Sequence, residues 1–144
     1  MLSDEELMDA LPGVRVDHDN APHYRGLLER RLLINRCDDC GTWHHPPRSV
    51  CPACWSRTVT ATEVRGEGTI AMLTFLHQRP RRAGGDDDGP YPVVAVELIE
   101  QPGLRVAATI MDAQPEQIVL DTAVELAWVE RDGRPVAAFR LVSS

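Results

Sequence analysis

Alternation between apolar and polar positions in the second half of the chain predicts five β-strands. We expect strands at residues 68–78, 91–99, 104–111, 123–130 and 134–142. Pro102-Gly103 is a turn signal between the second and third strands, and Asp132-Gly133 favours a tight hairpin between the last two. Pro115 predicts the start of a short helix between the third and fourth strands. Five strands with one helical turn at that place indicate an OB-type barrel.

Helical periodicity replaces this alternation near the N-terminus. Residues 3–10 predict a short helix because Ser3 and Glu6 have the spacing of a capping box. A second helix is predicted from Asn20, with a stripe of apolar side chains on one face. The stripe consists of Tyr24, Leu27, Leu28 and Leu32. It either packs on the body of this chain or forms a docking arm for another protein, and the sequence leaves both interpretations open.

These patterns divide the chain into three parts and predict a mainly β protein. We expect an N-terminal helical arm at residues 1–32, a four-cysteine zinc ribbon at residues 33–58 and a five-stranded OB-fold barrel at residues 59–144. A Gly-rich, charged segment at residues 79–90 separates the first two barrel strands. A solvated loop is the ordinary interpretation of such a charge run, and a phosphate-binding arginine patch is the alternative.

All four cysteines of the chain lie in two Cys-x-x-Cys pairs separated by ten residues. Each pair can turn two sulfurs toward one ion, and four thiolates complete the tetrahedral shell that Zn²⁺ prefers. Iron in the same four-sulfur geometry is the chief alternative. Because a closed shell leaves no position for water or substrate, we expect a structural site. Its predicted ligands are Cys37, Cys40, Cys51 and Cys54.

Other side chains in the cysteine module are expected to support it rather than bind the metal. His44 and His45 are interpreted as exposed or second-layer residues, since four cysteines already fill the shell. The aromatic and proline residues are expected to pack around the ribbon, which has almost no other core. These are Trp43, Pro46, Pro47 and Trp55. Elsewhere, the sequence contains no nucleophile elbow, phosphate loop or His-Glu-x-x-His motif.

Charge and composition then narrow the class of partner. The chain has 144 residues, with 15 Lys and Arg against 22 Asp and Glu, so its net charge is −7. This balance argues against nucleic acid, whose binding depends on neutralising phosphates. No apolar run approaches the roughly 18 residues of a membrane span, and the acidic start does not fit a secretory signal. We therefore expect a cytoplasmic protein without membrane contact, in which clustered cysteines bind metal rather than form disulfides.

Several motifs occur in an order that is more specific than any one of them. They are PHYRGLLERRLLINRCDDCG, PPRSVCPAC, GEGTIAMLTF, YPVVAVEL and VELAWV, which span roughly residues 22–142. In this order the chain resembles the rubredoxin-like zinc-ribbon and OB-fold proteins associated with acyl-CoA metabolism. One departure is Asp121, where the pattern before the fourth barrel strand often has glycine.

The resemblance implies a non-catalytic accessory subunit of a thiolase-like or aldolase enzyme, in some systems together with a hydratase-like protein. The reactions it implies act on CoA thioesters and include steroid side-chain retro-aldol cleavage and acyl transfer. The catalytic residues are expected on the partner, with the ribbon and N-terminal helices as docking elements. The four cysteines match the family's metal ligands, and no catalytic residue carries over.

If CoA binds at the partner interface and contacts this chain, arginine side chains are the candidates for its phosphates. They are Arg48, Arg79, Arg81 and Arg82. Two other functions are weighed against the accessory subunit. A single-stranded nucleic-acid binder would need basic and aromatic residues across the barrel face, and a small electron carrier would need iron in the four-sulfur site.

Overall fold

The structure is a computed structural model that describes residues 2–77 and 90–142. These residues form two compact units. The ribbon unit runs to Arg65 and includes Trp128–Ala137, whereas the barrel unit runs from Gly66 to Ala127 and includes the chain from Ala138 onward. A three-stranded sheet lies in the ribbon unit, and most of a five-stranded sheet lies in the barrel unit. Within the described ranges, no helix is long and apolar enough to cross a membrane.

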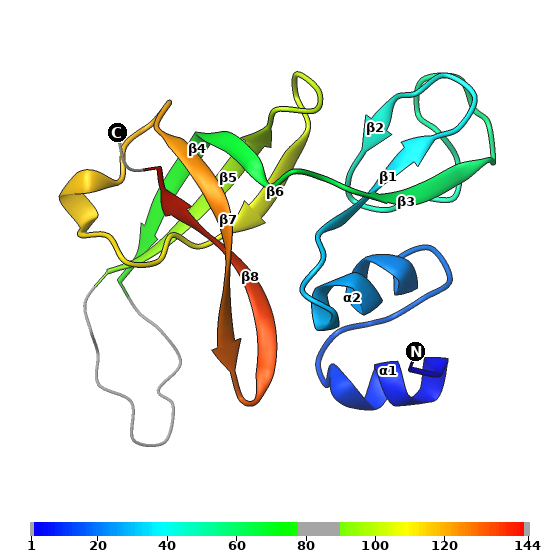
Figure 1. Ribbon diagram of the computed structural model, residues 1–144, viewed down its shortest axis with the longest axis horizontal. Helices are drawn as coiled ribbons and strands as arrows, with labels where there is room; N and C mark the ends of the chain where they lie inside the picture. The colour runs from blue at the N-terminus through cyan, green and yellow to red at the C-terminus, as the bar shows by residue number, and fades with distance from the viewer. Residues whose placement is uncertain (1, 78–89, 143–144) are drawn as a thin grey trace. The chain divides into compact units, whose positions relative to one another are not determined.

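The ribbon unit contains two short helices and a three-stranded antiparallel sheet (Figure 1). Its elements are α1 (Asp4–Ala10), α2 (Ala21–Leu28), β1 (Leu33–Cys37), β2 (Trp43–His44) and β3 (Val59–Glu63). β1 lies in the centre of the sheet, between β2 and β3. β3 pairs with β1, so this sheet includes residues 59–63, which the predicted division assigned to the barrel. The three-part division of the chain stays a proposal.

The first helix has the predicted N-terminal cap. The backbone N–H of Glu6 donates to Ser3 Oγ at 3.2 Å, and the backbone N–H of Ser3 donates to Glu6 Oε2 at 2.8 Å. The reciprocal bonds satisfy two donors that the first helical turn would otherwise leave without partners. The capping-box prediction is therefore confirmed. Arg25 on α2 also forms an ion pair with Asp4, which links the two helices.

The second helix is shorter than its apolar stripe predicted. It ends at Leu28, where Arg31 N–H donates to Gly26 O at 2.8 Å and Arg30 adopts a left-handed φ of 59°. This pair of features is a Schellman-type ending, in which the chain reverses out of the helix. Leu32 was predicted on the helix face but follows this reversal instead, and its side chain is buried.

Gly26 permits that reversal because the chain passes very close to its Cα. A Cβ at this position would lie 2.8 Å from both the Arg31 carbonyl oxygen and Leu33 Cγ. Such distances are shorter than ordinary van der Waals contacts, so only glycine fits without movement of the backbone. Gly26 is therefore required by the turn that ends the helix.

Most of a five-stranded antiparallel sheet with the order β6-β5-β4-β7-β8 belongs to the barrel unit, whereas the parts of β7 and β8 within Trp128–Ala137 are grouped with the ribbon unit. The elements of this region are β4 (Glu67–Leu76), β5 (Tyr91–Leu98), β6 (Arg105–Ala108), the 3₁₀ helix η1 (Pro115–Gln117), β7 (Ala123–Arg131) and β8 (Arg134–Leu141). Ile110, just after β6, forms a parallel bridge with Phe139 on β8, which curls the sheet toward closure. The predicted OB fold is confirmed, including the helical turn at Pro115.

The core of the barrel follows the predicted alternation of side chains. On β5, Val94, Val96 and Leu98 are buried, while the residues between them are partly exposed. Ile70 on β4 and Phe139 on β8 are also buried. Fully burying an aliphatic or phenylalanine side chain stabilises a fold by about 1.5–3 kcal/mol. These inward side chains therefore fix the register of the sheet, because a shift by one residue would expose them.

The Gly-x-Gly motif that opens the barrel serves two different close approaches. Gly66 has a φ of 77°, and a Cβ there would lie 2.5 Å from Leu126 Cβ. Gly68 pairs with Leu98, and a Cβ there would lie 2.3 Å from the Glu97 carbonyl oxygen. The first glycine thus meets a conformational and a steric need, whereas the constraint on the second is steric.

Asp121 occupies the position at which the related pattern often has glycine. Its φ is 65°, in the left-handed region that glycine adopts without cost. Aspartate is among the few other residues that occupy this region with any frequency. Its backbone N–H donates to Ile70 O at 2.8 Å, so the turn still joins the start of β7 to β4. The departure from the pattern is therefore accommodated without loss of the turn.

Candidate metal centre

Two turns with the same hydrogen-bond pattern carry the four cysteines. In the first turn, Cys37 N–H donates to Thr42 O at 2.9 Å and Gly41 N–H donates to Cys37 O at 3.0 Å. In the second turn, Cys51 N–H donates to Ser56 O at 2.8 Å and Trp55 N–H donates to Cys51 O at 2.9 Å. Gly41 and Trp55 therefore hold equivalent positions, and both have left-handed φ values, 77° and 66°.

The two turns bring their four sulfur atoms together. All four Sγ atoms lie within 4.8 Å of one another, and among the described residues this is the group of Cys, His, Asp and Glu side chains with metal-binding geometry. The Cys37–Cys54 sulfurs are 3.5 Å apart and the Cys40–Cys51 sulfurs 3.6 Å. A disulfide needs about 2.05 Å, whereas zinc–sulfur bonds of about 2.3 Å in a tetrahedron imply sulfurs about 3.8 Å apart. The arrangement therefore fits one metal ion.

Backbone groups near the cysteines also suit thiolate ligands. Cys40 N–H points at Cys37 Sγ at 3.5 Å, and Ala53 N–H points at Cys51 Sγ at 3.4 Å. Donors aimed at sulfur stabilise its negative charge. Cys37 and Cys51 are buried, whereas Cys40 and Cys54 are exposed, so each turn contributes one inner and one outer ligand.

Crowding of the four sulfurs favours a bound cation, and it shifts the pKa values of two thiols in opposite directions. Contact with Thr42 lowers the pKa of Cys40 to about 6. At Cys54 a hydrogen bond from the Ser56 backbone favours the thiolate, but the neighbouring sulfurs of Cys37 and Cys40 outweigh it and raise its pKa to about 12. Without a counter-charge, the last thiol of such a cluster keeps its proton at neutral pH. A divalent ion removes this repulsion and completes the site.

His44 and His45 were interpreted as exposed or second-layer residues rather than as ligands, and the structure excludes the exposed alternative. His44 is buried at 7 % exposure, and its Nε2 lies 3.3 Å from the Arg48 carbonyl oxygen. His45 is half-buried, with its ring centroid 5.1 Å from that of His23. Neither belongs to the sulfur cluster. The contact of His44 with the Arg48 carbonyl oxygen supports the loop between the cysteine turns, which is a structural role.

Asn35 is a supporting residue that sequence reasoning missed. It lies on β1 at 7 % exposure, and its Nδ2 donates to the Arg48 carbonyl oxygen at 3.1 Å. A buried amide needs such a partner to offset the cost of leaving water. This bond ties the segment before Cys51 to the central strand. Its only sequence signal is a polar residue at an inward position of the apolar segment LLIN.

We expect acid to destabilise the ribbon unit through His45. Burial, together with the charges of His23 and His44, lowers the pKa of His45 to about 4. Because the unfolded imidazole titrates near pH 6.5, the unfolded chain takes up the proton first, and stability falls as the pH drops from about 6.5 toward 4. Between pH 7 and pH 5.5 the expected loss is about 1 kcal/mol. Denaturant unfolding of the zinc-loaded protein at both values measures it.

The variant His45→Gln tests this assignment, with His18→Gln as an exposed control. His45→Gln is expected to flatten the change in unfolding free energy between pH 7 and pH 5.5, whereas His18→Gln is expected to preserve it. An equal slope in wild type and His45→Gln would show that other groups cause the acid sensitivity. His23, whose pKa is also lowered by burial, is then the next residue to replace.

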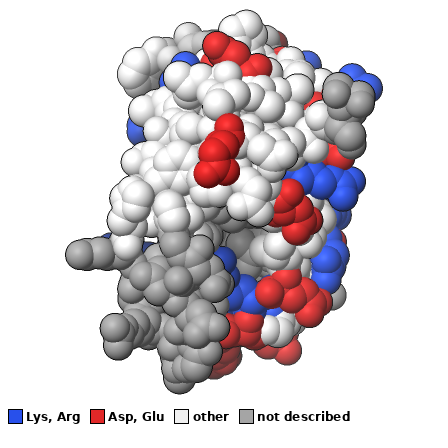
Figure 2. Space-filling view, turned by 90° about the vertical axis from the view of Figure 1, so that its left-hand side faces the viewer, with Lys and Arg blue, Asp and Glu red and all other residues white. Residues whose placement is uncertain are grey.

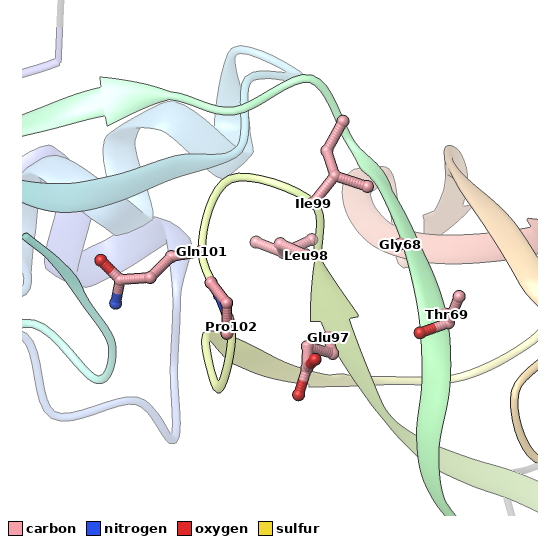
Figure 3. Close-up of a pocket in the computed structure, with 7 residues that line it drawn as sticks. All are labelled: Gly68, Thr69, Glu97, Leu98, Ile99, Gln101 and Pro102. Carbon is pink, nitrogen blue, oxygen red and sulfur yellow. The ribbon is translucent and has the colours of Figure 1, made fainter.

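The structure does not assemble the four candidate arginines into a CoA site. Arg48 is exposed next to the ribbon, whereas Arg79, Arg81 and Arg82 lie outside the described residues. The barrel unit has a shallow pocket of about 230 Å³ between β4 and the connection from β5 to β6 (Figure 3). Its lining includes no Lys, Arg or His, and its one carboxylate, on Glu97, pairs with Arg105. This pocket is therefore poorly suited to phosphate groups.

The two aromatic residues expected to pack around the ribbon behave differently. Trp43 is half-buried, and the Arg36 guanidinium lies over its ring at 5.2 Å, as in a cation–π contact. Trp55 is 79 % exposed, so its predicted packing role is wrong. The left-handed turn at Trp55 directs the side chain outward, and the spacing of the cysteines does not reveal this.

Comparison with known proteins places these observations in a family. The family model of the ChsH2 rubredoxin-like zinc ribbon domain matches residues 25–60, and that of the ChsH2 C-terminal OB-fold domain matches residues 61–129. A chain in the solved structure described as "Ltp2-ChsH2(DUF35) aldolase" is 32 % identical to this chain, with a TM-score of 0.77. The match covers 89 % of this chain and 98 % of that one.

Two curated relatives have different names and different lengths. A "DUF35 domain-containing scaffold protein" of Methanocaldococcus jannaschii is 31 % identical over 76 % of this chain and 78 % of its own length. A "Probable enoyl-CoA hydratase alpha subunit" of Thermomonospora curvata is 34 % identical over 84 % of this chain. The match spans only 36 % of that relative's length, so most of that protein has no counterpart here.

Proposed function

Because the chain belongs to the ChsH2 family, in which a rubredoxin-like zinc ribbon precedes an OB-fold domain, we propose that it is a non-catalytic accessory subunit. It binds and supports a thiolase-like or aldolase enzyme that acts on acyl-CoA thioesters. The observation that carries the proposal is the similarity, at a TM-score of 0.77, to a chain of a solved Ltp2-ChsH2 aldolase. The scaffold-protein name of the Methanocaldococcus relative supports it.

The metal in this proposal is zinc, held by Cys37, Cys40, Cys51 and Cys54, and its role is structural. Four sulfurs within 4.8 Å of one another satisfy a tetrahedral ion and leave no position for substrate. The ion instead fixes two turns that the ribbon's small sheet could not hold together alone. Iron in the same site would give visible absorbance, so a colourless metal-loaded protein would contradict the electron-carrier alternative.

The lining of the barrel pocket supports a partner that supplies the chemistry. Catalytic acids and bases usually lie in a cleft. Within the described residues, the one ionisable side chain lining this pocket is Glu97, which pairs with Arg105. The proposal therefore assigns the catalytic residues to the partner.

A hydratase-like partner is a second candidate. The Thermomonospora relative is named as a subunit of an enoyl-CoA hydratase, and this chain matches about a third of it. Enoyl-CoA thioesters and the substrates of thiolases or aldolases share the CoA group. An assay with different CoA thioesters, including those of steroid side chains, identifies the acyl group of the substrate.

Surface charge argues against the nucleic-acid alternative. Figure 2 shows a face with few charged side chains among the described residues, and Arg side chains lie mostly along one edge beside Asp and Glu. A single-stranded nucleic-acid groove requires a continuous basic track with aromatic side chains. With a net charge of −7, the chain would also repel phosphates at long range. We therefore rank this function below a protein partner.

Co-expression with the thiolase-like or hydratase-like proteins encoded beside this chain tests the proposal. The expected result is a complex that survives size-exclusion chromatography and cleaves or hydrates CoA thioesters, whereas the isolated chain shows neither activity. Candidate substrates are steroid side-chain and simple acyl thioesters. Activity of the isolated, metal-loaded chain would contradict the accessory role, and so would failure of every neighbouring enzyme to bind it.

A further inference from the structure

Trp55 is unusual both in its exposure and in its backbone conformation. Its side chain is 79 % exposed, the largest exposed fraction among the large hydrophobic residues described. Its φ of 66° lies in the left-handed region, which disfavours residues with a Cβ. The equivalent position of the first cysteine turn is Gly41, which adopts this conformation without strain. The ribbon thus carries a strained tryptophan where its own fold is satisfied by glycine.

Burial within this chain does not explain the residue. An indole with four-fifths of its surface in water contributes little hydrophobic stabilisation to its own domain. Strained residues with no local benefit are typical of functional positions, where a ligand or partner gains from their placement. Tryptophan is also the residue type most enriched among the side chains that dominate protein–protein binding.

The turn fixes the backbone of Trp55. Its N–H donates to Cys51 O at 2.9 Å, and the following residue, Ser56, accepts from Cys51 N–H at 2.8 Å. Ser56 Oγ also donates to the Asp39 carboxylate, which joins this turn to the first one. A metal ion at the four sulfurs would fix both turns further. A backbone that is already ordered loses little conformational freedom on binding, which favours affinity.

The surroundings of Trp55 are acidic. Asp38 and Asp39 are exposed in the first cysteine turn, and four thiolates around one divalent ion carry a net charge of about −2. Even with the exposed Arg36 and Arg57 counted, these turns remain negative. Nucleic acid and anionic lipid would be repelled, and so would the same surface of a second copy. Charge complementarity therefore selects a protein surface with basic side chains.

We propose that Trp55 is the anchor by which the ribbon unit binds its enzyme partner, inserting into an apolar pocket bordered by Lys or Arg side chains. This inference rests on the proposed accessory function and names the residue and the chemistry of the surface that it engages. The acidic turns guide the approach, and the buried indole provides most of the affinity. The partner's pocket, rather than this chain, supplies the apolar surface against which the Trp55 side chain packs.

The test measures binding of the zinc-loaded, full-length chain to the partner recovered by co-expression, using surface plasmon resonance. Trp55→Gly removes the indole and the strain together, so it is expected to weaken binding by at least about 30-fold without lowering Tm. Trp55→Phe is expected to lose less affinity. Asp132→Gly is the matched control because Asp132 is also exposed with a left-handed φ, 54°, outside the cysteine turns. It is expected to bind within threefold of wild type.

The outcomes separate this inference from the function on which it rests. If wild type binds and Trp55→Gly binds equally well, the anchor is overturned while the accessory role stands. If wild type binds none of the enzymes, both proposals fail. If Trp55→Gly dissociates a homodimer in analytical ultracentrifugation, a second copy is the occupant and the enzyme anchor is wrong. Association should also slow as NaCl rises, and a rate independent of salt would overturn the basic border.

Discussion

Replacing Cys51 with serine is expected to release the metal and unfold the ribbon sheet. Cys51 is buried among the sulfurs, and serine is a poor ligand for an ion that prefers thiolates. Binding of structural zinc is worth about 10–16 kcal/mol in small zinc domains, and that free energy is also folding free energy. A site with three thiolates loses most of it. The ribbon sheet is small and has few other means to stay ordered.

Metal content and folding are measured on the same samples. Elemental analysis should fall from about one zinc per wild-type chain to near zero in Cys51→Ser, and amide NMR signals of β1, β2 and β3 should lose dispersion. Signals of the barrel sheet should persist, because its core comes from a separate unit. Ser49→Ala, an exposed neighbour, serves as the control. A Cys51→Ser protein that keeps one zinc and native dispersion would show that the site is not structural.

Gly68→Ala should destabilise the barrel by about 3 kcal/mol, near the upper end for an added methyl group. The new Cβ would meet Glu97 O at 2.3 Å and Val96 Cγ1 at 2.7 Å. One of these atoms belongs to the backbone of β5, so a rotamer change cannot relieve the clash. The two strands must separate locally, which weakens the hydrogen bonds that join β4 to β5.

Urea unfolding of the zinc-loaded protein measures this effect against two controls. Thr69→Ala alters the next, exposed residue and should change the unfolding free energy by less than about 0.5 kcal/mol. Gly103→Ala introduces a Cβ at a φ of 81° with no atom within 4 Å, so it isolates the cost of left-handed strain, about 1 kcal/mol. If Gly68→Ala costs no more than Gly103→Ala, the strands have more room than the distances indicate.

The sequence predicted best the features that depend on neighbouring residues. The strands follow from alternation, the α1 cap from the spacing of Ser3 and Glu6, and the sulfur cluster from two short turns. Each of these signals lies within a few residues. The end of α2 was missed because the reversal occurs at Arg30 rather than at a glycine, and propensity alone gives no sign of this.

The error at Trp55 has a physical cause. The direction of a side chain depends on the backbone conformation beneath it, which residue type does not specify. Trp55 was expected to pack because it is aromatic, but it has a left-handed φ and is 79 % exposed. For His44, two alternatives were left open, exposed or second-layer, and contacts with Asn35 and the Arg48 carbonyl oxygen, which the sequence does not reveal, accompany its burial. Contacts with CoA would depend on the partner as well, so this chain alone does not define them.

Residues that meet at the metal site are close in sequence, whereas residues that meet in the barrel are far apart in sequence. This difference sets an order of assembly. Cys37 and Cys54 are separated by only 17 residues, so closing the loop around an ion costs little chain entropy. The barrel instead needs β4 to find β7 across the whole of β5 and β6, and Ile110 to find Phe139. Contacts of such high sequence separation form slowly. We therefore expect the cysteine turns to form first during refolding with zinc, and closure of the barrel to limit the overall rate.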